Sequence, residues 1–221
     1  MLERLSGLLP ATLLARSGAV FNTGRSAFES PSRLYLLGLN PGGDPATHQH
    51  ETVASQMDAV LAKPGHWSAF RDDSWDGYPP GTKGMQPHVV HLLQQLGHEA
   101  HAVPTSNLIF ERTRSEEDLK SRRRELAEVC WPVHEEIIDC LGVKVILCFG
   151  GFTGSWVRKR VCANRLVDSF VEKNQRRWKS TAHANSDGLI VVTASHPARA
   201  HWRFEATDPS PLVKAMLERA G

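Results

Sequence analysis

The sequence predicts an α/β protein, a three-layer α/β/α sandwich around a central four-stranded parallel sheet. Three observations support this prediction. Four short runs rich in Val, Ile or Leu occur along the 221 residues, each bounded by Gly, Pro, Ser or Asn. Helical patterns lie between the runs, and strands that alternate with helices form parallel βαβ units. The runs are nearly continuous in apolar residues, as expected for strands that helices cover on both faces.

The elements follow from these patterns in chain order. The expected strands are Arg33–Leu39, Ala102–Ile109, Val143–Phe149 and Leu189–Ala194. The expected helices are Gln86–Leu96, a helix or a pair broken near Pro132 that runs from Ser115 to about Leu141, Phe152–Cys162, and Pro211–Arg219. Gly97 is a good C-cap for the first helix, and Ser115 followed by acidic residues is a good N-cap for the second.

Two segments lack this regular pattern. The stretch Asp44–Thr82 is polar and rich in Gly, Pro, His and Trp, with helical periodicity only around Thr52–Leu61. A long segment of this kind inside a compact domain is usually functional or mobile. Residues 163–188 are expected to form a surface loop or a hairpin.

Composition limits the class of protein. The length fits one domain over residues 1–221, and 41% hydrophobic with 23% charged residues is ordinary for a globular protein. No apolar run approaches the roughly 18 residues of a membrane span, and the N-terminus lacks the pattern of a signal peptide. The four cysteines form no C-x-x-C pair, so we expect reduced thiols, a cytoplasmic location and no metal or iron–sulfur cluster.

The net charge of +2 does not by itself indicate nucleic-acid binding. The basic residues are clustered, however, at Arg122–Arg124, Arg158–Arg160 and Arg176–Lys179. Surfaces that bind phosphates need such clusters, because neutralising phosphates releases counterions. Solvated helix faces produce the same pattern, so both interpretations of each cluster stay open.

The first candidate site follows the first strand, in the run Gly38-Leu39-Asn40-Pro41-Gly42. Ligands of open α/β sheets bind just beyond the carboxyl ends of the strands, and Asn40 is at such an end. Pro41 fixes the backbone, and Gly42 allows close approach of a ligand. The alternative is a tight structural turn in which Asn40 satisfies its own backbone.

The second candidate site follows the last strand, in His196-Pro197-Ala198-Arg199. An apolar strand again ends in a proline turn that carries one polar side chain. Because parallel strands end at the same edge of a sheet, His196 and Asn40 are expected to face one cleft. A structural histidine at the end of a strand is the alternative.

Together the two turns resemble signatures of the uracil-DNA glycosylase superfamily, closest to its mismatch-specific and single-strand-selective branches. Gly38–Gly42 is similar to the Gly-(Ile/Met)-Asn-Pro-Gly opening motif, and His196-Pro197-Ala198 is similar in part to a His-Pro-Ser loop. Two weaker matches lie between them in the family's order, at Asp76–Gly81 and Pro104–Leu108. The resemblance covers about three quarters of the chain, roughly from Leu34 to Trp202.

The resemblance implies a monofunctional glycosylase that flips a deaminated base out of DNA and hydrolyses its N-glycosidic bond with a positioned water. Asn40 would hold the water, and His196 would donate to O2 of the departing base. Asn107 would recognise the O4/N3 edge of uracil, and Gly38, Leu39 and Gly42 would also bind the substrate. Tyr78 would stack on the base, with Trp75 and Phe70 as alternatives. Pro197, Ala198 and Arg199 would contact the DNA.

Some positions depart from the family's pattern. Ala198 replaces a common serine, no large apolar residue follows Pro197 directly, and the spacing from Asn40 to Tyr78 is long. Asn107 and Tyr78 also have structural alternatives, as a strand-end cap and a packed loop aromatic. We therefore expect a monomer that acts on damaged or mismatched DNA, double- or single-stranded, with uracil or hypoxanthine as the base. The alternative is a silent or divergent relative that binds nucleic acid or nucleotide without excision.

Overall fold

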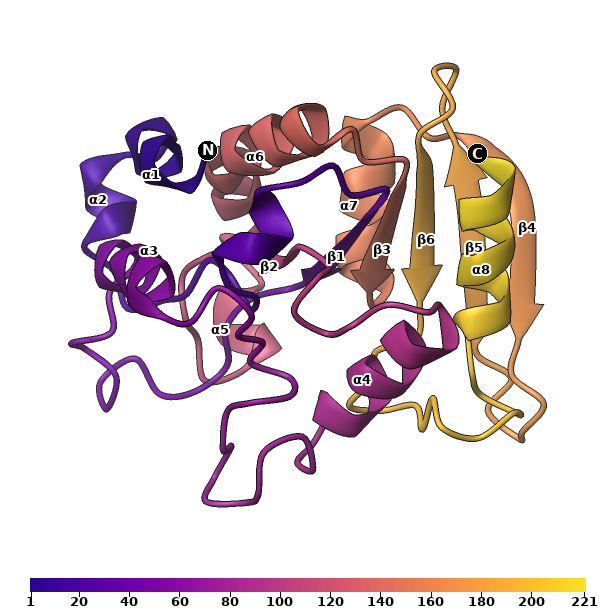
Figure 1. The fold of residues 1–221 in the computed structure, drawn as a ribbon, viewed down its shortest axis with the longest axis horizontal. Coiled ribbons are helices and arrows are strands. Elements are labelled where there is room, and N and C mark those ends of the chain that lie inside the picture. Colours follow the sequence, from indigo (N-terminus) through magenta and orange to yellow (C-terminus); the bar gives the residue numbers. More distant parts are fainter.

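The computed structural model describes residues 1–221 and contains one six-stranded sheet with the strand order β2-β1-β3-β6-β5-β4 (Figure 1). The strands are β1 (Leu34–Gly38), β2 (Thr105–Asn107), β3 (Val145–Phe149), β4 (Arg165–Val171), β5 (Lys179–Ala184) and β6 (Ile190–Ala194). The neighbours β2, β1, β3 and β6 pair in parallel, whereas β5 pairs antiparallel with β6 and with β4. The α/β class predicted from the sequence is therefore confirmed, with a mostly parallel sheet.

The predicted strand count of four is wrong. The four expected apolar runs all contain strands, but residues 163–188 add a β4–β5 hairpin to the sheet next to β6. Figure 1 shows β6 and β4 pointing the same way with β5 running against them. Four of the seven β4 residues are half-buried and the other three are exposed, so this edge strand lacks the continuous apolar run that marks a buried strand.

The carboxyl ends of the parallel strands are in register. Gly38 at the end of β1 lies opposite Asn107 at the end of β2, and Phe149 at the end of β3 lies opposite Ala194 at the end of β6. The segments that follow these four strands therefore leave the sheet at one edge. That edge is where ligands bind in open α/β sheets.

Helices cover both faces of the sheet. The α-helices are α1 (Leu2–Leu5), α2 (Ala11–Leu14), α3 (Val53–Ala62), α4 (Gln86–Gln95), α5 (Glu116–Leu119), α6 (Arg123–Leu141), α7 (Gly151–Arg160) and α8 (Ser210–Arg219). Apolar side chains of α6, α7 and the N-terminal helices pack on one face, and those of α4 and α8 pack on the other. Of the two expected alternatives after Ser115, a broken helix forms, but the break is at residues 120–122 and α6 continues through Pro132.

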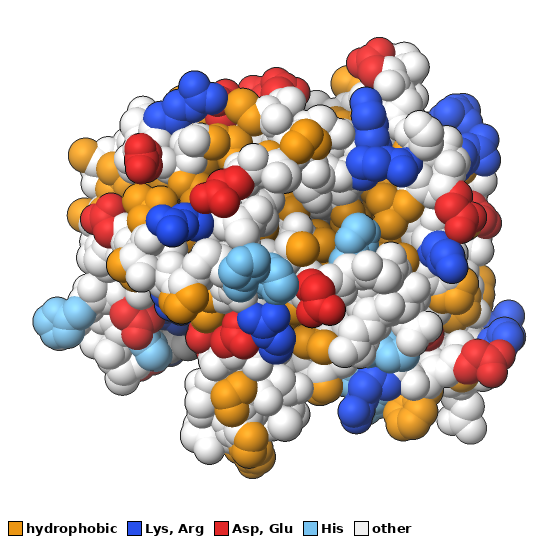
Figure 2. Space-filling model, in the orientation of Figure 1, with side chains coloured by type: hydrophobic (Ala, Val, Ile, Leu, Met, Phe, Trp, Pro, Cys, Tyr) orange, Lys and Arg blue, Asp and Glu red, His pale blue; other side chains and the backbone are white.

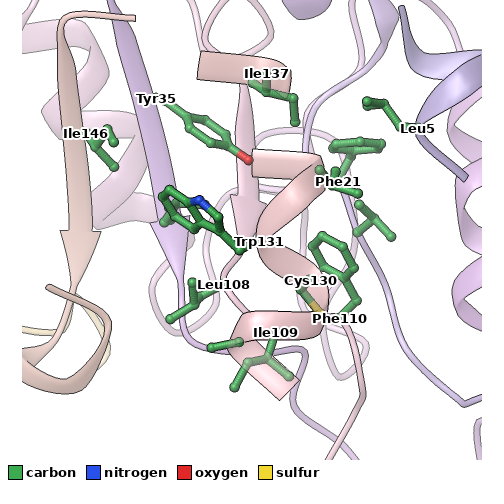
Figure 3. Close-up of a cluster of buried hydrophobic side chains, with 14 of the residues drawn as sticks. Leu5, Phe21, Tyr35, Leu108, Ile109, Phe110, Cys130, Trp131, Ile137 and Ile146 are labelled. Atoms are coloured by element: carbon green, nitrogen blue, oxygen red, sulfur yellow. The ribbon is translucent and has the colours of Figure 1, made fainter. Parts of the chain in front are cut away.

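The alternation of side chains along β1 explains the two cores. Tyr35 and Leu37 point toward α6 and belong to the larger cluster, whereas Leu34 and Leu36 belong to the cluster under α4 and α8. Figure 3 shows Tyr35 reaching toward α6, with Trp131 nearby. All four β1 side chains are at most 1% exposed, which is why the strand is apolar throughout.

The surface over α4 and α8 carries charges of both signs. In Figure 2, blue and red side chains are interspersed over this face, and neither forms an extended patch. No helix of the chain combines the length and the apolar character that a membrane span requires.

Candidate active site

A cavity of about 710 Å³ lies at the edge where the four parallel strands end. Each of these strands, or the turn that follows it, contributes to the lining. The contributing residues are Gly38, Leu39 and Asn40 at the end of β1, Asn107 at the end of β2, Phe149, Gly150 and Gly151 at the end of β3, and Ala194, Ser195 and His196 at the end of β6. The two turns singled out in the sequence thus meet in one cavity, together with Asn107.

Asn40 is held by a set of acceptors that fixes its orientation. Its Nδ2 donates to the carbonyl oxygens of Pro41 and Glu111 and to Thr113 Oγ1, at 3.1, 3.3 and 2.8 Å. Thr113 Oγ1 in turn donates to the Ser115 carbonyl, so it must accept from Asn40. Because carbonyl oxygens only accept, the amide cannot be reversed. Oδ1 therefore faces away from this network and is free to accept a hydrogen bond.

The Asn107 side chain, in contrast to that of Asn40, has no hydrogen-bond partner in the protein. Its side chain is 9% exposed and makes no hydrogen bond within the protein, although it lines the cavity. A Cβ atom at Gly38 would lie 2.5 Å from Asn107 Oδ1, so any larger residue at position 38 would push this amide out of its present orientation. Neither amide atom is fully enclosed, so water can pair with them until a ligand enters the cavity. Asn107 consequently offers one acceptor and two donors to a molecule in the cavity.

His196 presents a donor toward the cavity. The backbone N–H of Ala198 donates to its Nδ1 at 3.2 Å, so the proton of the neutral ring is on Nε2. Burial lowers the pKa of His196, and the nearby Arg199 lowers it further, while Glu116 acts in the opposite direction. The ring is therefore neutral near pH 7 and acts as a hydrogen-bond donor.

The cavity also contains the start of α7. Gly150 has a φ of +92° and directly precedes this ten-residue helix, whose first residues Gly151, Phe152 and Thr153 line the cavity. Thr153 Oγ1, Thr193 Oγ1 and Ser195 Oγ are buried and have no partner in the protein. A helix N-terminus with unpaired hydroxyls nearby favours an anionic or polar ligand.

Tyr78, which the sequence suggested for stacking, does not line the cavity, so the structure gives no support to that role. Its side chain is 51% exposed and Lys83 Nζ lies 3.9 Å from its ring centre. The alternatives Phe70 and Trp75 also lie outside the cavity, because they pack against the core under α4 and α8. The aromatic residues that do line it are Phe149, Phe152 and Trp178.

Trp178 reaches the cavity from the β4–β5 hairpin. The Arg176 guanidinium lies 4.4 Å from the Trp178 ring centre and donates to the Arg199 carbonyl at 2.8 Å. The hairpin is thereby fastened to the turn that carries His196. Lys179, from the same hairpin, adds a cation to the cavity.

The remaining predicted residues divide into two groups. Leu39, Ala198 and Arg199 line the cavity, whereas Gly42 and Pro197 do not. The Gly42 carbonyl accepts a hydrogen bond from Arg112 at 2.6 Å, which gives this residue a structural role in the turn. Pro197 is buried within the turn after β6.

Some cavity residues were absent from the sequence prediction. Phe149-Gly150-Gly151 repeats the pattern of an apolar strand followed by glycine, so the third strand end was detectable from the sequence. Trp178 was not, because its position depends on the register of a hairpin with weakly buried strands. No protein-family model matches this chain, and no curated protein matches it either, so the functional inference rests on the site itself.

Proposed function

We propose that this chain is a DNA glycosylase of the uracil-DNA glycosylase type, which hydrolyses the N-glycosidic bond of a flipped-out deaminated base. The observation that carries the proposal is the meeting of Asn40, Asn107 and His196 in one cavity, each from a different strand end. The hydrogen bonds of Asn40 and His196 leave an acceptor on the first and a donor on the second, and the Asn107 amide makes no hydrogen bond within the protein. These are the three polar functions that hydrolysis of a bound uracil requires.

The reaction would use these groups as follows. The bond between C1′ and the base nitrogen breaks, and its electron pair leaves with the base as an anion. His196 Nε2–H donates to O2, where part of this charge develops, in the manner of an oxyanion hole. A water that donates a hydrogen bond to Asn40 Oδ1 adds its oxygen to C1′. Its proton passes to solvent and the base anion takes one up, so water is consumed and an abasic sugar and a neutral base are formed.

The state of the two catalytic side chains fits this chemistry. Asn40 cannot take a proton, so it can only orient the water, and we expect modest rates. The lowered pKa of His196 keeps the ring neutral, so Nδ1 can accept from the Ala198 N–H while Nε2–H remains the donor toward the base. Acidification below the lowered pKa would add a proton at Nδ1 and break the contact with the Ala198 N–H.

Recognition of the base would rest on Asn107 and the aromatic walls. Asn107 Nδ2 can donate to O4 of uracil while Oδ1 accepts from N3–H. Phe149, Phe152 and Trp178 supply apolar surface, and stacking recovers roughly 1–3 kcal/mol per base against the cost of unstacking. Uracil is the proposed substrate, with hypoxanthine as the second deaminated base.

The test is an excision assay on labelled oligonucleotides that contain uracil, hypoxanthine, xanthine or a thymine mismatch, in single and double strands. Alkali converts each abasic site into a strand break that gel electrophoresis resolves. We expect cleavage at uracil, with His196→Ala reducing the rate strongly. Failure to cut any lesion at low salt and excess protein would overturn the proposal.

A second candidate is a relative that binds nucleic acid or a nucleotide without excising a base. The start of α7, with Gly150, Gly151 and the unpaired Thr153 hydroxyl, favours it, because this arrangement suits a phosphate whether or not chemistry follows. Tight binding with a steep salt dependence and no product in the same assay would support this candidate.

A further inference from the structure

A second hollow of about 800 Å³ adjoins the cavity and extends between α6 and α7. We call it the α6–α7 groove. It shares Glu116, Gly151 and Phe152 with the cavity, so the two hollows are continuous. The start of α6 and the whole of α7 form its walls, and two of the basic clusters in the sequence meet there.

The groove carries more positive than negative side chains. Arg123 pairs with Glu116 at 3.3 Å and Arg160 pairs with Glu128 at 3.8 Å. Arg124 and Lys159 are exposed and form no ion pair, so they leave two uncompensated cations.

Aromatic rings accompany these cations along one side of α7. Phe152 and Trp156 are four residues apart and therefore lie on the same side of the helix, and both line the groove half-buried. The Trp156 ring is supported by Trp131 at 5.3 Å between ring centres. Cations that follow a backbone together with rings for base stacking are the two parts of a single-strand binding surface.

We propose that the α6–α7 groove binds the single strand that flanks the target nucleotide, on one side of it only. This inference rests on the proposed function, because the cavity would fix the nucleotide from which the flank extends. The ten residues of α7 span about 15 Å, which corresponds to about four stacked nucleotides at 3.4 Å each. Arg124 and Lys159 contact the phosphates and Trp156 contacts the flanking bases, while Phe152, with the Arg123 guanidinium 4.1 Å from its ring centre, lies where the groove joins the cavity.

The test measures binding of single strands by fluorescence anisotropy. A uracil is placed at either end of a strand, and the flank is lengthened from one to eight nucleotides on the 5′ or the 3′ side. We expect affinity to rise over the first four or so nucleotides on one side, at least tenfold in total, and to change little on the other. The double variant R124E/K159E should lose this gain. Its slope of log K against log salt should be less steep by about 1.4, since each phosphate contact on a single strand contributes about 0.7.

The matched control is K214E/R219E, which changes the net charge equally at two exposed residues of α8 that form no ion pair. It should retain the one-sided gain. The proposed role of the groove would be overturned if both double variants lost the gain in affinity equally, or if flanks on the two sides of the uracil raised the affinity equally. Uracil excision is measured in parallel on the same strands. Excision without a one-sided gain would refute the groove alone, whereas a one-sided gain without excision would refute the glycosylase and leave the groove standing.

Discussion

The ends of β1 and β2 lie side by side in the sheet, yet the asparagine at one end is fixed by hydrogen bonds and the asparagine at the other is not. Three acceptors fix the Asn40 amide, whereas the Asn107 amide has no partner in the protein. A group that must position a water has to be rigid before the substrate arrives. A group that recognises a base must keep its own donors and acceptors free. Under the proposed function, this contrast separates Asn40, which would position the water, from Asn107, which would recognise the base.

The largest expected effect comes from removing the Asn40 side chain, whose amide is fixed by hydrogen bonds. Asn40→Ala should lower the single-turnover rate of uracil excision at least about 100-fold, comparable to the loss of one well-placed polar group in other active sites. Substrate affinity should change by less than about threefold, because in the proposed mechanism the amide contacts the water and not the base. Quench-flow rates and anisotropy titrations measure the two quantities.

Thr113→Val is the matched control, because it removes one acceptor of Asn40 and leaves the amide in place. We expect its single-turnover rate of uracil excision to lie between the rates of the wild type and of Asn40→Ala. A rate for Asn40→Ala within tenfold of the wild type would break the contrast between the two asparagines.

The next effect concerns what holds the backbone at the end of β2. His134 Nε2 donates to the Leu108 carbonyl at 3.2 Å, and Tyr35 donates to His134 Nδ1 at 2.8 Å. Burial lowers the pKa of His134 to about 4, from an ordinary value of 6.5. As the pH falls from 6.5 toward 4, the unfolded chain binds a proton that the folded chain does not. The free energy of unfolding should therefore fall by about 3 kcal/mol over this range.

Urea titrations between pH 4 and 8 measure this loss. His134→Gln retains a donor and an acceptor but does not titrate, so it should be less stable at pH 7 and less sensitive to acid. Parallel stability curves for the two proteins would show that His134 does not hold the end of β2 in its neutral form.

A smaller effect is expected from substituting Asn107. Asn107→Asp replaces the amide donor by a carboxylate that only accepts, so O4 of uracil loses its partner. We expect kcat/KM for uracil to fall about 10- to 100-fold, which corresponds to roughly 1–3 kcal/mol for a lost buried hydrogen bond. Thermal melting of the variant checks that the fold persists. An unchanged kcat/KM would mean that Asn107 does not contact the base.

The smallest effect is expected from substituting aromatic residues. Here Trp178, in the β4–β5 hairpin, is compared with Tyr78, in the segment before α4. Trp178→Ala should reduce uracil excision about tenfold, because this ring lines the cavity and stacking is worth roughly 1–3 kcal/mol. Tyr78→Ala should change it less than about twofold, because Tyr78 is half-exposed and outside the cavity. Steady-state rates compare the pair, and the reverse order of effects would restore the role predicted for Tyr78.

Some parts of the fold and of the candidate site could be predicted from the sequence, and others could not. The apolar strands, the turns after β1 and β6 and the position of Asn107 were predictable, because buried strands are apolar throughout and parallel strands end at one edge. The β4–β5 hairpin was missed as part of the sheet because its strands are only partly buried. The position of Tyr78 outside the cavity could not be predicted, because the segment before α4 has little periodicity and its course depends on contacts such as that with Lys83. How the two asparagines are held depends on Thr113 and Gly38, whose contacts only the folded chain reveals.

The most direct measurement follows the free base. A single strand with a radiolabelled uracil is incubated with excess protein, and the released base is separated from the strand by chromatography. We expect one free uracil for each abasic site with the wild type, and almost none with Asn40→Ala over the same time despite equal binding. Binding of the uracil strand by the wild type without release of any free base would contradict a base-excision site at the ends of β1, β2 and β6.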